Sequence, residues 1–109
     1  FCLSRGLGDV YKRQVSMCDA LQVAIPGELT FPVNRALLSG SLVVTDDEVA
    51  AAMRMAYAEL KLVVEPGGAV GLAALLAGRL DVRGKTVAVV LSGGNVDADT
   101  YARILQPEA

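Results

Sequence analysis

The residues with the clearest chemical potential are Ser92, Gly93 and Gly94, which follow the apolar, β-branched run TVAVVL at 86–91. In an open parallel sheet, ligands bind in the crevice beyond the carboxyl ends of the strands, which is where this loop would lie. Glycine tolerates positive φ and lets a flat ligand approach the backbone, because no Cβ intervenes. Taken alone, however, a Ser-Gly-Gly turn favours a purely structural connection between a strand and a helix.

The chain contains no histidine. This excludes Ser/His/Asp and Cys/His triads, the usual zinc ligand sets and histidine general bases. Any chemistry must therefore use hydroxyls, carboxylates, the backbone or a cofactor. We predict no metal site in this chain.

Local patterns predict the elements that would position the loop. Thr45 and Glu48 form a capping-box pattern, in which each side chain satisfies a free amide at a helix start. The helix that follows would cover a sheet with an apolar face made of Val49, Met53, Ala56 and Leu60. After the interruption at 65–68, an alanine-rich helix is predicted at 69–77, and Asp97 is predicted to cap a helix at 98–105.

Earlier segments complete the predicted order of elements. Residues 21–25 are predicted to form a strand or an extended loop that ends at a Pro-Gly turn. Thr30 is predicted as the N-cap of a helix that stops at Gly40. The repeated order of strand, loop and helix favours an α/β fold.

Composition narrows the partners and the compartment. Ten Lys and Arg stand against twelve Asp and Glu, a formal net charge of −2, and three of the basic residues lie in the first 14 positions. This argues against nucleic acid, which requires a clustered basic surface. With only Cys2 and Cys18 there is no disulfide framework, so we expect a reducing compartment, the cytoplasm. No apolar run is long enough for a membrane span, so no membrane partner is expected.

Several motifs resemble one enzyme family in their order along the chain. LSGGNVD at 91–97 and VEPGGAVGLAALLAG at 64–78 resemble closing motifs of the fold-type-II pyridoxal-phosphate enzymes, which include threonine dehydratases and serine racemase. CDAL at 18–21, PGELTF at 26–31 and TDDE at 45–48 resemble the same family. The resemblance covers residues 15–107.

The resemblance implies the C-terminal part of the large domain of a tryptophan synthase β-like enzyme, with a partly parallel sheet and covering helices. It implies a pyridoxal 5'-phosphate-dependent threonine/serine dehydratase, an ammonia-lyase that converts L-threonine or L-serine to a 2-oxo acid and ammonia. The parent enzyme is expected to be a homo-oligomer. Because the chain ends soon after LSGGNVD, we expect no regulatory domain, although truncation would also explain that end.

The roles that the resemblance implies are few. Ser92 matches the serine that hydrogen-bonds the ring nitrogen of the cofactor, Gly93 and Gly94 match the backbone beside the ring, and Glu65 matches a carboxylate in the nearby wall. The alternative for Glu65 is a carboxylate that interacts with the amides of residues 67–69 at its own helix start. Asp19 and Ala20 match a segment near the ring, although the family often has glycine at the position of Ala20.

The family's catalytic lysine and its glycine-rich phosphate loop precede the matching segment in the family pattern, and neither is found here. Lys61 and Lys85, the lysines beyond residue 14, are predicted to be solvated charges on a helix face and in a polar turn. We therefore predict no catalytic residue in this chain and no activity for the chain by itself.

Two alternatives remain open. One is a piece of a serine racemase or of another β-eliminating pyridoxal enzyme, because Ser92 and the Glu-Pro-Gly-Gly turn are shared among these enzymes. The other is a small phosphate-binding module that uses the Gly93-Gly94 loop. Such a module predicts a basic residue beside that loop, and the nearest basic residue, Arg103, lies on the following helix.

The first 14 residues differ in character from the rest. Back-translation of SRGLGDVYKRQ at 4–14 resembles a transposon-end adapter used to build sequencing libraries, so we interpret 1–14 as a non-native leader. The alternative is a genuine disordered tail. The pyridoxal enzyme segment then occupies 15–109.

Overall fold

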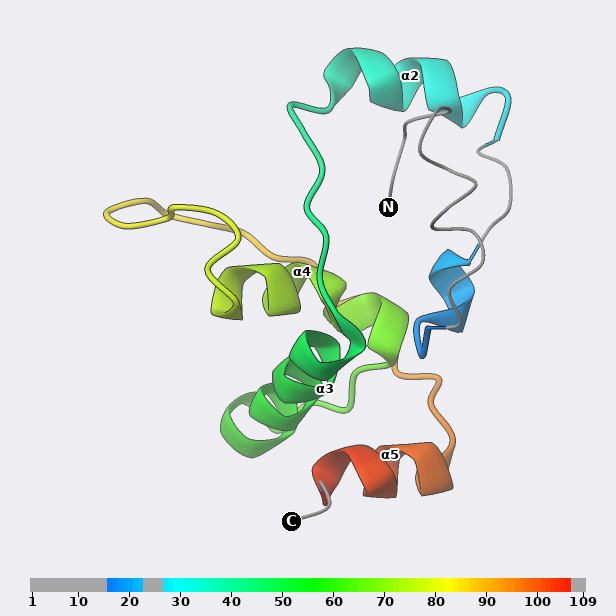
Figure 1. Ribbon diagram of the computed structural model, residues 1–109, viewed down its shortest axis with the longest axis vertical. Coiled ribbons are helices and arrows are strands. Elements are labelled where there is room, and N and C mark those ends of the chain that lie inside the picture. Colours follow the sequence, from blue (N-terminus) through cyan, green and yellow to red (C-terminus); the bar gives the residue numbers. More distant parts are fainter. Residues whose placement is uncertain (1–15, 23–26, 107–109) are drawn as a thin grey trace.

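The computed structural model describes residues 16–22 and 27–106. The leader interpreted at 1–14 and most of the predicted strand or extended loop at 21–25 lie outside these ranges. The described elements in chain order are the 3₁₀ turn η1 (Asp19–Leu21), α2 (Thr30–Leu37), α3 (Asp46–Met55), the π-helical turn η2 (Ala56–Leu60), α4 (Pro66–Leu76) and α5 (Ala98–Leu105). Figure 1 shows α3 and α4 at the centre, with α5 beside α3 and α2 set apart from both.

Helix α3 begins as the capping box predicts. The Glu48 amide donates to Thr45 Oγ1 at 3.2 Å, and the Thr45 amide donates to Glu48 Oε2 at 2.8 Å. Both bonds satisfy amides that have no partner inside the helix. The helix then continues into η2 and ends at Lys61, a non-glycine residue with φ of 59°.

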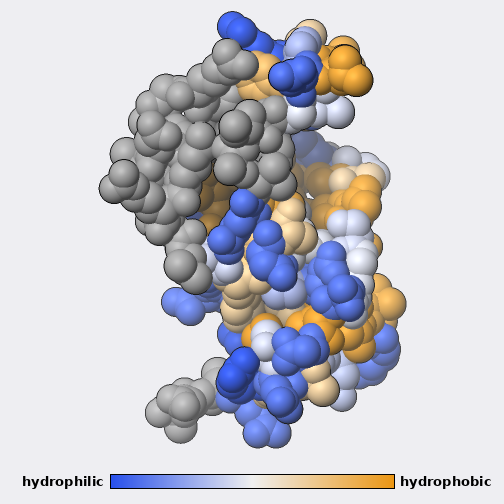
Figure 2. All heavy atoms as spheres, turned by 90° about the vertical axis from the view of Figure 1, so that its right-hand side faces the viewer, coloured by the Kyte–Doolittle hydropathy of each residue, from blue (hydrophilic) through white to orange (hydrophobic). Residues whose placement is uncertain are grey.

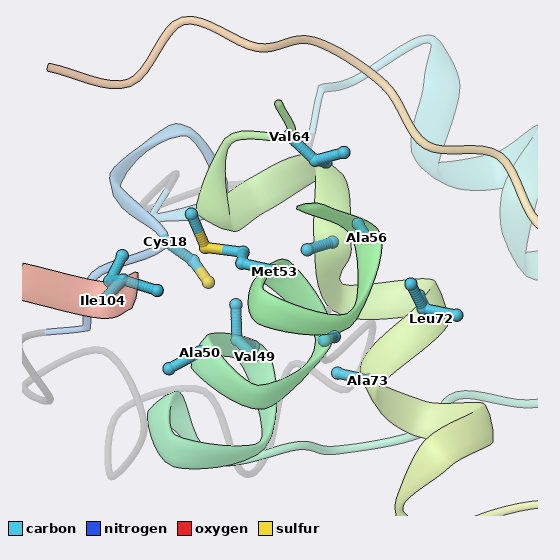
Figure 3. Close-up of a cluster of buried hydrophobic side chains, with 11 residues drawn as sticks. Cys18, Val49, Ala50, Met53, Ala56, Val64, Leu72, Ala73 and Ile104 are labelled. Carbon is cyan, nitrogen blue, oxygen red and sulfur yellow. The ribbon is translucent and has the colours of Figure 1, made fainter. Parts of the chain in front are cut away.

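The core lies where α3 packs against α4 and α5 (Figure 3). Val49 and Met53 of α3 are its largest fully buried side chains. Four alanines on α3, η2 and α4 have no exposed surface, so the helix backbones approach closely: Ala52, Ala56, Ala69 and Ala73. Leu60, which we predicted for the same apolar face, is 46% exposed, because it lies beyond the end of α3 in the π-helical turn.

Helix α4 starts earlier than predicted, at Pro66 rather than at Ala69. Proline suits the first helical position, because its fixed φ is already helical and its missing N–H would have had no partner there. The Glu-Pro-Gly-Gly turn is therefore the first turn of the helix and not a break before it. Gly78, with φ of 65°, follows its end as predicted.

The prediction for α2 is wrong in its boundaries. The N-cap position is Leu29, and Thr30 lies inside the helix, where its hydroxyl donates to the Gly27 carbonyl. The helix ends at Leu37 because Leu38 turns to extended backbone, before Gly40 is reached. Among the described elements none packs against α2, and its apolar side chains stay at the surface at the top of Figure 2, with Leu37 79% exposed.

The sheet remains a prediction. The described residues contain no strand, and 86–91 run as an extended segment without backbone hydrogen bonds to other described segments. Strands form only when their amides and carbonyls find a neighbouring strand. Among the described elements α3 packs against α4 and α5. The helices in the described ranges are also too short or too polar to cross a membrane.

Acid should weaken the helix starts. The pKa of Glu48 lies below its ordinary value, chiefly because its carboxylate accepts the Thr45 amide, and the pKa of Asp97 is lowered by the Thr100 amide. A carboxylate with a lowered folded-state pKa stabilises the fold above its unfolded pKa of about 4, and this stabilisation is lost as the pH falls through the folded value. We expect helical circular dichroism to decline in that acid window.

The substitution Glu48→Gln should reduce the pH-dependent part of this decline, because the amide still accepts the Thr45 hydrogen bond but no longer titrates. Glu59→Gln is the control, since Glu59 lies exposed on η2 and makes no hydrogen bond within the described residues. Equal acid sensitivity of the two variants would contradict the assignment of the effect to the cap.

Candidate cofactor-facing loop

The loop at 92–95 lies directly against the first turn of α4. The Glu65 amide donates to the Gly93 carbonyl at 3.2 Å, and the Asn95 amide donates to Glu65 Oε2 at 3.0 Å. These two bonds join segments 28 and 30 residues apart. The structure thus brings together all four predicted site residues: Ser92, Gly93, Gly94 and Glu65.

The side chain of Glu65 does not cap its own helix. The amides of Gly68 and Ala69 donate to the Glu65 backbone carbonyl at 3.0 and 3.1 Å, and no side-chain capping bond forms. The alternative that placed this carboxylate on the amides of its own helix start is therefore wrong. The carboxylate instead reaches across to the loop, where it accepts a hydrogen bond from the Asn95 amide.

Three glycines make this approach possible. Gly93 has φ of 77°, and a Cβ added there would lie 2.6 Å from Glu65 Oε1. A Cβ on Gly94 would lie 2.8 Å from the Val63 carbonyl oxygen, and one on Gly68 would lie 1.9 Å from the Ser92 carbonyl oxygen. At Gly94 and Gly68 the obstacle is backbone, so the two segments fit only while these positions lack side chains, whereas Gly93 is favoured mainly by its positive φ.

Ser92 presents its hydroxyl on an exposed stretch of the loop. Within the described residues this hydroxyl has no hydrogen-bond partner, whereas the neighbouring backbone is held by α4. The preceding residues Val89 and Leu91 pack against the core, and Asp97 begins α5 by accepting the Thr100 amide at 2.8 Å. The predicted cap at Asp97 is confirmed.

The segment at 16–21 completes the surroundings. Ala20 lies beside Gly67, because a Cβ added to Gly67 would meet that of Ala20 at 3.5 Å. Asp46 fixes this segment: its carboxylate accepts the Ser16 hydroxyl at 2.6 Å and the Met17 amide at 3.0 Å. Sequence reasoning missed Asp46, although its place in an acidic first turn marked it as a possible acceptor.

An open hollow of about 570 Å³ lies next to the contact between the loop and α4, and residues of α3, α5 and η1 line it. Asp19, Pro66 and Asn95 line it together with Arg54 and Arg103, whereas Ser92 does not. The Arg54 guanidinium donates to the Ile104 carbonyl and that of Arg103 to the Thr100 hydroxyl. Both arginines line this hollow, whereas Gly93 and Gly94 do not.

The two lysines in the described part of the chain are exposed. Lys61 ends the π-helical turn and donates to the Ala58 carbonyl. Lys85 lies in the turn that follows Val82. Both positions agree with solvated charges.

Comparison with protein-family models matches residues 2–93 to the family described as pyridoxal-phosphate dependent enzymes. The match begins inside 1–14, and the interpretation of that segment as a leader stays a prediction.

Curated relatives cover most of this chain. L-threonine ammonia-lyase of Thermotoga maritima is 38% identical over 103 residues, which are 94% of this chain and 25% of the relative. L-threonine ammonia-lyase of Geobacter sulfurreducens is 43% identical over 93 residues, 84% of this chain and 23% of the relative. Serine racemase of Dictyostelium discoideum is 35% identical over 94 residues, which are 83% of this chain and 28% of the relative. The chain thus spans about a quarter of the length of the relatives it matches.

A solved structure, the crystal structure of a T.th. threonine deaminase, matches with a TM-score of 0.70 and 37% identity. The match covers 76% of this chain and 30% of that one. The helical arrangement described above therefore resembles part of a larger solved protein.

Replacing Glu65 should release the loop from α4. In Glu65→Ala the Asn95 amide loses its acceptor, and we expect faster hydrogen exchange at that amide and a loss of about 1 kcal/mol of stability. Glu59→Ala removes the same side chain from an exposed site on η2 and should change neither quantity. Unchanged protection of the Asn95 amide in Glu65→Ala would show that the carboxylate does not hold the loop.

Proposed function

Because this chain belongs to the pyridoxal-phosphate-dependent enzyme family, we propose that it is the cofactor-ring-binding part of an L-threonine or L-serine ammonia-lyase. The whole enzyme would convert its amino-acid substrate to a 2-oxo acid and ammonia. The observation that carries the proposal is the Ser92-Gly93-Gly94 loop fixed on the Glu-Pro-Gly-Gly helix start. The threonine ammonia-lyases among its relatives support the same substrate class.

The loop is suited to a flat heteroaromatic cofactor. Gly93 and Gly94 offer backbone without side chains, and the exposed Ser92 hydroxyl has no partner within the described residues. Pyridoxal phosphate, when bound, supplies a ring that withdraws electrons from the substrate's reacting carbon. In this proposal Ser92 would hold the ring nitrogen, Gly93 and Gly94 would lie beside the ring, and Glu65 would form the nearby wall while it fixes the loop.

A hydroxyl has a specific electrostatic consequence at a ring nitrogen. A carboxylate there would stabilise a protonated nitrogen and a strongly electron-withdrawing ring, whereas the neutral Ser92 hydroxyl can donate to an unprotonated nitrogen. With Ser92 at that position, the bound ring would withdraw electrons less strongly, which would favour loss of the substrate's β-hydroxyl.

The extended segment 86–91 is proposed to be a strand of a parallel sheet in the whole enzyme. Its apolar side chains support this, because Val90 is 81% exposed and Val87 is 42% exposed. In a parallel sheet buried on both faces, such residues would be covered, and the loop after them would lie at the ligand crevice.

The rest of the enzyme would supply the lysine that bonds the cofactor and the loop that binds its phosphate. We propose that the chain alone is inactive, that the parent is a homo-oligomer, and that it works in the cytoplasm on a small amino acid rather than on nucleic acid or a membrane.

A serine racemase is the second candidate, because serine racemases of Dictyostelium discoideum and rice are 35% and 40% identical to this chain. The product separates the two functions. Incubation of the full-length enzyme with L-serine and L-threonine should yield 2-oxo acid and ammonia, and accumulation of D-serine as the main product would favour the racemase.

The role of Ser92 can be tested in the full-length enzyme. Ser92→Ala should weaken cofactor binding by a hydrogen bond's worth, about 1 kcal/mol or roughly fivefold. Ser92→Asp should lower the rate of 2-oxo acid formation and shift the cofactor's absorption spectrum, because a carboxylate favours a protonated ring nitrogen. Wild-type elimination and an unchanged spectrum in Ser92→Asp would contradict the contact with the ring nitrogen.

The isolated chain should not bond the cofactor. After incubation with pyridoxal phosphate and reduction with borohydride, mass spectrometry should detect no stoichiometric adduct, because Lys61 and Lys85 are exposed and lie outside the loop. The full-length enzyme treated in the same way is the positive control. A single fully modified lysine in the isolated chain would refute the proposed division of roles.

A further inference from the structure

The first turn of α4 contains two adjacent glycines, Gly67 and Gly68, in a helix otherwise rich in alanine and leucine. Glycine is the poorest helix former after proline, about 1 kcal/mol less favourable than alanine in a helix interior. Two such residues in one turn therefore suggest a reason other than helix formation. The surroundings differ sharply between the two positions.

At Gly67 an added Cβ would meet Ala20 Cβ at 3.5 Å and Leu21 Cγ at 3.6 Å, which are ordinary van der Waals distances. At Gly68 it would lie 1.9 Å from the carbonyl oxygen and 2.8 Å from the carbonyl carbon of Ser92. The group in the way is backbone rather than the end of a flexible side chain. Only position 68 therefore requires glycine.

The Ser92 peptide is fixed by this contact and by its neighbours. On one side Leu91 packs against the core, and on the other the Gly93 carbonyl accepts the Glu65 amide at 3.2 Å. Between these two fixed points the Ser92 carbonyl lies against Gly68, in the space that a Cβ would occupy. With both ends held, the position of that carbonyl sets the direction of the Ser92 Cα–Cβ bond.

We propose that Gly68 is a positioning residue for Ser92. Because Gly68 has no side chain, the Ser92 carbonyl can lie against the first turn of α4, and this contact sets the direction of the Ser92 hydroxyl. The inference rests on the proposed role of Ser92 in holding the cofactor ring. A methyl group at position 68 would lie 1.9 Å from the carbonyl oxygen, so the carbonyl would have to move by about 1.5 Å to reach normal contact distance. A hydrogen bond stretched by that amount is lost.

The test compares Gly67→Ala, Gly68→Ala, Ser92→Ala and the double variant Gly68→Ala/Ser92→Ala in the full-length enzyme. Gly68→Ala should weaken pyridoxal-phosphate binding to the apoenzyme about fivefold and alter the bound cofactor's absorption spectrum, as Ser92→Ala does. The double variant should be no weaker than either single variant, because both remove the same bond. Gly67→Ala should bind like wild type.

Two results would overturn the proposal. One is wild-type cofactor affinity and spectrum in Gly68→Ala. The other is an additive loss of about 25-fold in the double variant, which is the behaviour of an independent structural defect.

Hydrogen exchange in the apoenzyme separates this inference from the proposed function. Gly68→Ala should speed exchange at the Asn95 amide, because the displaced loop moves away from Glu65, whereas Gly67→Ala should not. If Ser92→Ala leaves cofactor affinity unchanged, the proposed role of Ser92 is wrong, and equal exchange in the two glycine variants would independently refute positioning by Gly68.

Should Gly68→Ala fail to fold, Gly94→Ala provides a milder displacement of the same loop, because its Cβ would lie 2.8 Å from the Val63 carbonyl oxygen. Its loss of cofactor affinity should again be non-additive with that of Ser92→Ala. Wild-type cofactor affinity in Gly94→Ala would then contradict the proposal that the contact between the loop and α4 positions Ser92.

Discussion

The contact between the loop at 92–95 and the first turn of α4 depends on Glu65, which binds the loop twice. Its backbone amide donates to Gly93, and its carboxylate accepts the Asn95 amide. An ionised acceptor strengthens such a bond, and glycines at the crossing points let the two backbones meet. The position of Ser92 follows from this junction, and Pro66 and Asn95 from its two sides also line the hollow beside η1.

The core that supports the junction is built mainly from small side chains. Buried alanines on α3, η2 and α4 allow the helices to approach closely, while Val49 and Met53 fill the larger spaces. Close packing of this kind transmits displacements, because it leaves few voids in which a shifted backbone can relax. The first turn of α4 therefore holds the loop at 92–95 in a fixed position.

Several apolar side chains of the described residues are exposed. This is expected of a segment that spans only about a quarter of its relatives' length. Val90 in the extended segment and Leu37 on α2 are mostly exposed. Surface of this kind is normally covered in a complete domain. The loop at 92–95 is thus held from one side by α4, and the proposed function assigns its opposite wall to the rest of the enzyme.

The sequence by itself determined the features that depend on near neighbours: the capping box at Thr45 and the cap at Asp97 with α5 after it. Their spacing within one helical turn is sufficient to form them. Only the tertiary structure decided that the Glu65 carboxylate binds Asn95 and that Asp46 binds Ser16, because these partners are about 30 residues apart. The predicted strand at 86–91 has the same limitation, since a strand requires a distant partner that local sequence does not specify.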